Sequence, residues 1–367
     1  MKRLKYLAVV ACAALAAGCE HMFDEYNSDP NNTEMWQIHP ESMMEQLLFS
    51  AADELMYGTW QLNGELMQYT VNLQSENIHR YIIRDSYANT PWNYLSKWAS
   101  NADHMRRLAI LKEEPNCQAI ALTMRALMVS NQTDLFGSIP FSEAYKGRDT
   151  VAITQPRYDT QQEVYTRLLQ DLELANSLYN ASLGLDDPTK DGIYGGDIAK
   201  WQKFTNTLRL RLLMRVSGRN NAFTPTVGEQ INQIISNPGK YPVFESNDDN
   251  ATVKFSGSAE YYKTYFNSSS FPDDKSLSSD HHIAAQLLDL LYDASDGFVD
   301  PRLRIWIKPR YVQYPSATEP DVIREMIGAV SGCTINYNGI TSISEREPYL
   351  HLSLIHISEP TRLRCIS

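Results

Sequence analysis

Residues 196–211 read GDIAKWQKFTNTLRLR, and they predict the fold class most directly. The apolar side chains Trp201, Phe204 and Leu208 recur at intervals of three and four, and Leu212 continues the series. This spacing is the period of one face of an α-helix. The stretch therefore predicts a helix with one face buried against neighbouring elements.

Arginines also lie along this predicted helix: Arg209, Arg211, Arg215 and Arg219. They are too many for a dry core, because a buried cation needs an anionic partner. We expect them to pair with acids of a neighbouring helix, such as Glu173 or Asp171.

Helical spacing recurs on both sides of this stretch. Helices are expected to begin near residues 40, 61, 92, 117, 161 and 198, with a last one over about residues 282–292. Asn116 and Thr160 are candidate N-caps. The starts follow no fixed period, so no sequence repeat is indicated. The pattern predicts a mostly α protein, an array of paired helices with long irregular loops.

Composition limits the function classes. The chain has 367 residues, 43% of them hydrophobic, which is ordinary for a globular protein of one large domain or two smaller ones. Its formal net charge is −11. Nucleic acid is excluded as an expected partner, because a phosphate backbone requires a basic surface.

The N-terminus has the pattern of an export signal. Lys2, Arg3 and Lys5 precede twelve apolar or small residues, a run too short to span a bilayer. The run ends in LAAGC at residues 15–19, which resembles the lipobox of bacterial lipoproteins. We expect residues 1–18 to be a lipoprotein signal peptide and Cys19 to be the lipidated residue. The alternative is an ordinary cleaved signal in which the cysteine is coincidental.

Turn residues dominate residues 19–38, which are expected to be a lipid-anchored linker. The helical domain is expected over residues 39–351. Residues 352–362 read LSLIHISEPTR, which resembles a translated sequencing adapter. Residues 352–367 are therefore expected to be a non-native tail, with a genuine tail as the alternative.

Two cysteines remain in the helical domain, Cys117 and Cys333. An oxidising cell envelope permits a disulfide between them, and two free thiols are the open alternative. No spacing typical of a metal site is present, and we expect no metal and no cofactor. Residues 187–192 resemble the start of an EF-hand loop, but its twelfth position is Ile198 instead of glutamate.

No catalytic motif for a serine hydrolase, zinc protease, nucleotide-binding loop or dinucleotide fold occurs. The chain is therefore expected not to be an enzyme. Paired carboxylates for glycoside hydrolysis come together only in the fold, which leaves a surface glycan hydrolase as a minor alternative.

Four stretches together resemble the SusD/RagB family of outer-membrane lipoproteins, in the order that the family has them. They are FDEYNSDPN at residues 23–31, DLFGSIPFSEA at 134–144, PRYD at 156–159 and the stretch at 196–211. The resemblance covers most of residues 19–218, is loose over residues 219–351, and is to SusD-like proteins of the starch-binding-associated type. The family continues into further helices, which are expected to be missing here.

The resemblance implies a tetratricopeptide-like helical scaffold and a role in nutrient uptake by Bacteroidota. Family members are anchored on the outer-membrane surface, capture a glycan or in some cases a peptide, and deliver it to a SusC-like TonB-dependent transporter. A surface adhesin or structural lipoprotein is the alternative function.

A glycan site needs aromatic side chains, whose flat faces stack on sugar rings. The expected binding residues lie in two predicted loops: Tyr81, Tyr87 and Trp92 in the first, and Tyr261, Tyr262 and Tyr265 in the second. A third aromatic segment covers residues 306–314. Trp60, Trp98 and Trp201 fall in predicted helices and are expected to be core residues.

Overall fold

The computed structural model describes residues 38–72, 77–147, 152–253, 281–293, 298–303, 307–308 and 351–352. The chain divides into two compact units, residues 1–39 and residues 40–367, and all elements below belong to the second. The predicted signal peptide, Cys19, Cys333 and Tyr261, Tyr262 and Tyr265 lie outside the described residues, as do residues 309–350 and 353–367. Within the described ranges, no helix is both long and apolar enough to cross a membrane.

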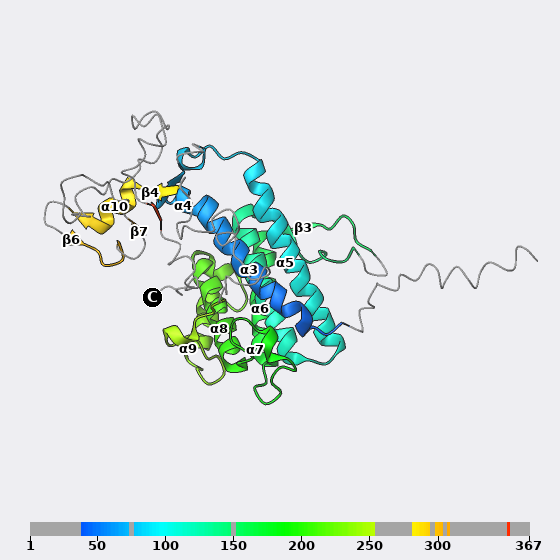
Figure 1. Cartoon of the computed structure of the whole chain (residues 1–367). Coiled ribbons are helices and arrows are strands. Elements are labelled where there is room, and N and C mark those ends of the chain that lie inside the picture. Colours follow the sequence, from blue (N-terminus) through cyan, green and yellow to red (C-terminus); the bar gives the residue numbers. More distant parts are fainter. Residues whose placement is uncertain are drawn as a thin grey trace, which may run out of the picture. The chain divides into compact units, whose positions relative to one another are not determined.

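Helices dominate the described residues, which confirms the predicted mostly α class. The longer ones are α3 (Glu41–Gly58), α5 (Ser86–Leu111), α6 (Pro115–Phe136), α7 (Gln161–Leu178), α8 (Ile198–Arg215) and α9 (Val227–Ile235). Consecutive members of this series pack against each other, α3 on α5, then α5 on α6, α6 on α7, α7 on α8 and α8 on α9 (Figure 1). The predicted array of paired helices is therefore present.

Short elements complete the described part. The helical ones are the π-helical turn η2 (Thr59–Asn63), α4 (Gly64–Leu66), α10 (Ala285–Leu291) and the 3-10 turns η3 (Ile78–Arg80), η4 (Pro188–Lys190), η5 (Ser217–Ala222) and η6 (Asn247–Asp249). The strands are β1 (Thr70–Asn72), β2 (Ile139–Pro140), β3 (Tyr158–Asp159), β4 (His281–Ile283), β5 (Tyr292–Asp293), β6 (Phe298–Val299), β7 (Ile307–Lys308) and β8 (His351–Leu352). A four-stranded antiparallel sheet has the order β1-β4-β8-β7, while β2 pairs with β3 and β5 with β6.

The core lies around α6, which is buried on nearly all sides between α5 and α7. Its sequence is apolar around the whole circumference, as expected for a helix enclosed by neighbours. Trp98 and Trp201 are 4% and 0% exposed, which confirms both as core residues. The side chain of Trp60 is not among those described.

Helix boundaries follow local chemistry. Thr160 caps α7 as predicted, in a reciprocal capping box with Glu163. The prediction that Asn116 is the N-cap of α6 was wrong, because the helix begins one residue earlier, at Pro115, a residue suited to the first helical position. Asn116 instead donates from its amide to the carbonyls of Asn180 and Gly184, at 2.9 and 2.7 Å.

Two other boundaries also correct the sequence-based expectation. The helix expected from residue 92 begins at Ser86 and contains Pro91, because a proline near a helix start removes only one hydrogen bond. The helix expected to begin near residue 61 ends at Leu66, and the chain continues into β1. The last helix is shorter than expected, because residues 281–283 form β4.

Ion pairs fix the helices to one another. Arg209 pairs with Glu173 of α7, as predicted. Asp171 does not pair with α8: it accepts from Arg125 at 2.6 Å, and Arg125 also binds Asp103 of α5. Burial raises the pKa of Asp103, but Arg125 and the arginines beside it outweigh burial and lower that pKa overall.

The loop that precedes α8 is organised by Asp191. Its buried carboxylate accepts from the backbone N–H groups of Ile193, Tyr194 and Gly196 and from the indole N–H of Trp201, at 2.8–3.1 Å. All of these donors are protein groups, so the carboxylate acts as the anchor of the loop. This arrangement explains why the stretch from residue 196 carries a signature of the fold.

Candidate functional site

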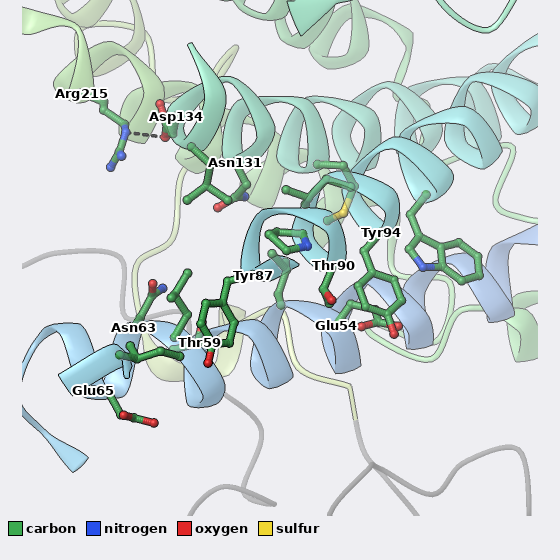
Figure 2. A pocket seen from close by; sticks show the side chains of 18 of the residues that line it. Glu54, Thr59, Asn63, Glu65, Tyr87, Thr90, Tyr94, Asn131, Asp134 and Arg215 are labelled. Atoms are coloured by element: carbon green, nitrogen blue, oxygen red, sulfur yellow. Dashed lines mark ion pairs between the residues drawn. The ribbon is translucent and has the colours of Figure 1, made fainter. Parts of the chain in front are cut away.

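A pocket with a cavity volume of about 590 Å³ lies among α3, η2, α4, α5 and the C-terminal parts of α6 and α8 (Figure 2). Its lining is Glu54, Leu55, Thr59, Leu62, Asn63, Glu65, Asn72, Ile78, Tyr87, Thr90, Pro91, Tyr94, Leu95, Trp98, Met128, Asn131, Asp134, Leu135, Arg211 and Arg215. The mixture of aromatic, apolar and hydrogen-bonding side chains is typical of small-ligand sites.

Helix α5 supplies the aromatic side chains of the pocket, Tyr87, Tyr94 and Trp98. They lie seven and four residues apart, a spacing that places them on one face of a helix. Trp98 is 4% exposed, and its indole N–H has no hydrogen-bond acceptor among the described residues. The nitrogen is itself closed off from solvent, so Trp98 forms part of the pocket wall and offers no donor that a ligand could reach.

Glu54 of α3 lies beside Tyr94 in the pocket (Figure 2). Burial raises the pKa of Glu54 most strongly; a hydrogen bond from Tyr94 and the charge of Lys97 lower it, Asp53 raises it, and the result is about 7. Burial and the same carboxylate raise the pKa of Tyr94 to about 12. Near neutral pH this pair can therefore both donate and accept hydrogen bonds to a ligand.

The other end of the pocket is formed by α6 and α8. Asp134 accepts from Arg215 at 2.5 Å (Figure 2) and from the Tyr165 hydroxyl at 2.6 Å. Asn131 lies one turn of α6 before Asp134, and its amide donates to the Leu127 carbonyl at 2.7 Å. Arg211 also lines this end and is exposed.

Of the predicted binding residues that the structure describes, Tyr81, Tyr87 and Trp92, only Tyr87 lines the pocket. Tyr81 is 59% exposed, and its hydroxyl donates to the Leu66 carbonyl at 3.2 Å. Trp92 packs edge-to-face on Phe136 with ring centroids 5.0 Å apart, so it covers the helical core. Tyr261, Tyr262 and Tyr265 lie outside the described residues, and their predicted role is untested.

The sequence-based reasoning missed Tyr94 and Trp98 as pocket residues. Both lie in a predicted helix, where an aromatic side chain is more often part of the core. Their spacing from Tyr87 was a signal that could have been used, because it places all three side chains on one face. For the pocket residues of α3, α6 and α8, no spacing in the sequence indicates that they line the same pocket.

Two carboxylates and a thiol meet elsewhere, at the start of α6. The ligating atoms of Glu41, Glu114 and Cys117 lie within 4.8 Å of one another. Burial, together with Glu114 and Glu41, raises the pKa of the Cys117 thiol, so it stays protonated and donates to Glu41 at 3.7 Å.

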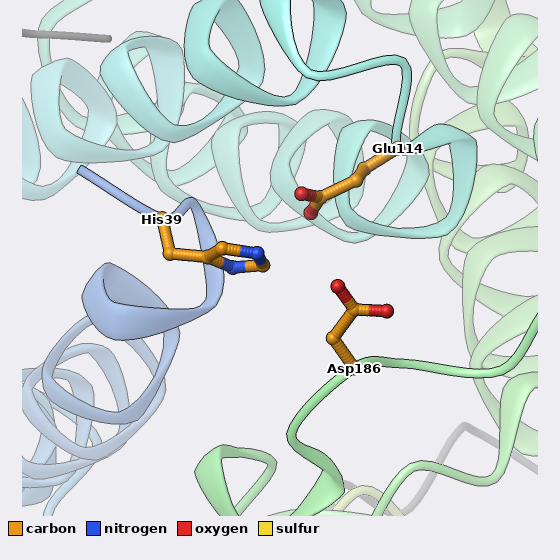
Figure 3. A group of neighbouring side chains, drawn as sticks. All are labelled: His39, Glu114 and Asp186. Carbon is orange, nitrogen blue, oxygen red and sulfur yellow. The ribbon is translucent and has the colours of Figure 1, made fainter. Parts of the chain in front are cut away.

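Glu114 also faces the loop after α7, where its carboxylate and that of Asp186 point into the same space (Figure 3). The backbone N–H groups of Asp186 and Asp187 donate to the Glu41 carboxylate at 2.7 and 2.5 Å. The residues around Glu41 therefore tie this loop to α3.

The described residues thus form an array of paired helices with a pocket among them. Residues 30–356 match the SusD-like family described as "Starch-binding associating with outer membrane". The chain belongs to this SusD-like family. No curated protein matches the sequence significantly.

Solved structures share the fold at low sequence identity. A chitin-binding protein is 23% identical with a TM-score of 0.62, and the match covers 87% of this chain and 68% of that one. A SusD homologue from Parabacteroides distasonis is 20% identical with a TM-score of 0.67, covering 89% of this chain and 65% of its own. A chitin-binding SusD homologue from Flavobacterium johnsoniae is 20% identical with a TM-score of 0.63, covering 87% and 61%. The chain thus spans about two thirds of the length of these proteins.

Proposed function

We propose that this protein captures a glycan at the outer membrane and presents it for import, and that the pocket beside α5 is its binding site. The observation that carries the proposal is the aromatic face of α5, Tyr87, Tyr94 and Trp98, in a pocket of a SusD-like chain. Aromatic rings can stack on the apolar faces of sugars, and the polar groups around them can bond hydroxyls.

The comparisons support a glycan as the ligand. The family is described as starch-binding, and two of the similar structures are chitin-binding proteins. A cavity of about 590 Å³ has room for a short oligosaccharide. The Glu54–Tyr94 pair offers directional contacts to sugar oxygens.

A binding titration tests the proposal. Starch- and chitin-derived oligosaccharides are titrated into the full chain by calorimetry, and the same titration is made with Tyr87→Ala. The variant is expected to bind about tenfold or more weakly, because it removes a stacking surface. Tyr158→Ala is the matched control, since Tyr158 is 62% exposed and does not line the pocket. Equal affinity in all three proteins would place binding elsewhere.

We further propose that Cys19 carries the lipid anchor, that the protein is exposed on the cell surface, and that a SusC-like TonB-dependent transporter receives the ligand. Stable anchoring by several acyl chains suits a protein that must stay near a transporter. We expect a pull-down of the wild type from outer membranes to retain a large β-barrel protein. We also expect Cys19→Ala to be absent from the membrane fraction. Recovery of the wild-type protein without any β-barrel protein would contradict the proposed transporter partner.

Glu54 is the observation that favours a hydrolase as second candidate, because a carboxyl with a pKa near 7 in a pocket is typical of a general acid. The Asp134 carboxylate is already bound by Arg215 and Tyr165, which leaves it poorly placed as the second carboxylate. Non-catalytic binding therefore accounts better for the pocket. Release of reducing ends by the wild type and not by Glu54→Gln would establish the hydrolase instead.

A further inference from the structure

The charged side chains that line the pocket fall into two sets. The acids are Glu54, Glu65 and Asp134, and the bases are Arg211 and Arg215, which lie four residues apart on α8. Which of these charges is available to a ligand depends on the contacts that each already makes.

Two of the acids are already engaged. Asp134 accepts from Arg215 at 2.5 Å and from the Tyr165 hydroxyl at 2.6 Å, so its charge and that of Arg215 offset each other. Glu65 is 3% exposed and accepts from the backbone N–H of His79 at 3.2 Å. Neither carboxylate is presented to a ligand as a free anion.

Glu54 carries less charge than an ordinary carboxylate near neutral pH. Burial raises its pKa, while Tyr94 and Lys97 act against burial and Asp53 acts with it, which leaves the pKa at about 7. Its end of the pocket therefore offers a neutral carboxyl for part of the population. A polar neutral group of the ligand fits that end.

Arg211 is the charge that remains. It is exposed, lines the pocket, and makes no ion pair or hydrogen bond with any residue that the structure describes. It lies about one helical turn from Arg215, and like charges at that spacing repel. A guanidinium presents a planar fork of donors that matches a carboxylate or a sulfate.

We propose that the pocket selects a glycan with an anionic substituent, a carboxylate or a sulfate on the sugar ring, and that Arg211 binds this substituent. This inference rests on the proposed function of the pocket and names its ligand class. The anion lies at the α8 end beside Arg215, and neutral parts of the sugar lie against Tyr87 and Tyr94. Binding there supplies Arg211 with the partner that the described residues do not provide.

The test uses the full chain and three ligands of similar length: trigalacturonate, a sulfated galactan oligosaccharide and maltotriose. At least one acidic ligand is expected to bind about tenfold or more tightly than maltotriose, as one charge-assisted contact would give. Arg211→Gln is expected to remove this preference, read as the ratio of acidic-ligand affinity to maltotriose affinity within each protein, while Arg211→Lys keeps part of it. Whether trigalacturonate or the sulfated ligand binds more tightly identifies the source of the anion.

Arg219→Gln is the matched control, because it removes an exposed arginine that does not line the pocket. Thermal melts by circular dichroism show that Arg211→Gln is folded. Maltotriose binding as tight as that of both acidic glycans, or an unchanged preference in Arg211→Gln, would overturn this inference. The proposed function would still stand in that case if Tyr87→Ala weakens binding. If none of the glycans binds, both this inference and the proposed function are overturned. If only a peptide binds, and its binding depends on Arg211, the ligand is a peptide carboxylate instead of a glycan.

Discussion

Gly196 occupies a position in the loop before α8 that other residues fit poorly. Its φ is +89°, in the region that favours glycine, and an added Cβ would lie 2.6 Å from the Cβ of Pro188. Its N–H also donates to Asp191 at 2.9 Å, so any shift of the backbone would disturb the anchor of the loop. The conformation and the close approach both require glycine here.

Gly196→Ala is expected to lower the free energy of unfolding by about 2 kcal/mol or more, because it adds a clash to backbone strain. Gly184→Ala is the control, since Gly184 has a φ of +63° but no atom within 4 Å of its added Cβ. We expect it to cost about 1 kcal/mol, the strain alone. Urea denaturation measures both, and equal losses would show that the Pro188 contact is unimportant.

Glu54 gives the protein a distinctive pH dependence. Because its pKa of about 7 lies above the ordinary 4.5, the folded protein holds this proton more tightly than the unfolded chain. The stabilisation is complete below pH 4.5 and is lost as the pH rises to about 7. Solvent screening of this half-buried group keeps the loss on the order of 1 kcal/mol.

Glu54→Gln is expected to flatten this dependence, since glutamine does not titrate. The measurement is the midpoint of thermal unfolding at several pH values from 4.5 to 7.5, for wild type and variant. A wild-type curve whose difference from Glu54→Gln stays constant over that range would contradict the raised pKa.

At the scale of the elements, the sequence predicted what local chemistry determines. The apolar stripe of α8, the capping box of Thr160 and the helical run of α3 are local signals, and the structure has all three. The start of α5 was misplaced: the helix was expected from residue 92, but it begins at Ser86 and contains Pro91. The residues after Leu66 were misassigned because β1 pairs with β4, more than 200 residues along the chain.

The ion cluster at the centre of the array joins three helices. Arg125 of α6 bonds Asp103 of α5 and Asp171 of α7, and all three side chains are buried. Arg125→Met is expected to destabilise the protein by about 3–5 kcal/mol, because it removes the buried cation that the two carboxylates share and leaves them only partly exposed arginines as partners. The free energy of unfolding in urea is the measurement.

Arg167→Ala serves as the control for that substitution. Arg167 also pairs with Asp171, at 3.0 Å, but its side chain is 61% exposed. Its loss is expected to cost less than about 1 kcal/mol. Similar losses for Arg125→Met and Arg167→Ala would mean that burial does not set the strength of this cluster.

At the scale of the whole molecule, the pocket is assembled from segments that are distant in the sequence. Glu54, Tyr94, Asn131 and Arg211 come from four helices, and no local pattern indicates that they meet. The sequence-based expectation placed binding aromatics on loops, whereas the described pocket takes them from one face of α5. The resemblance to a family could predict the scaffold, but the lining depends on packing between helices.

The central claim is that a glycan binds in this pocket, and a crystal structure of the full chain with the tightest-binding oligosaccharide tests it most directly. The account predicts sugar density against Tyr87 and Tyr94, with a sugar oxygen within hydrogen-bond distance of the Glu54 carboxyl or the Tyr94 hydroxyl. Sugar bound at another surface, with this pocket empty, would contradict it.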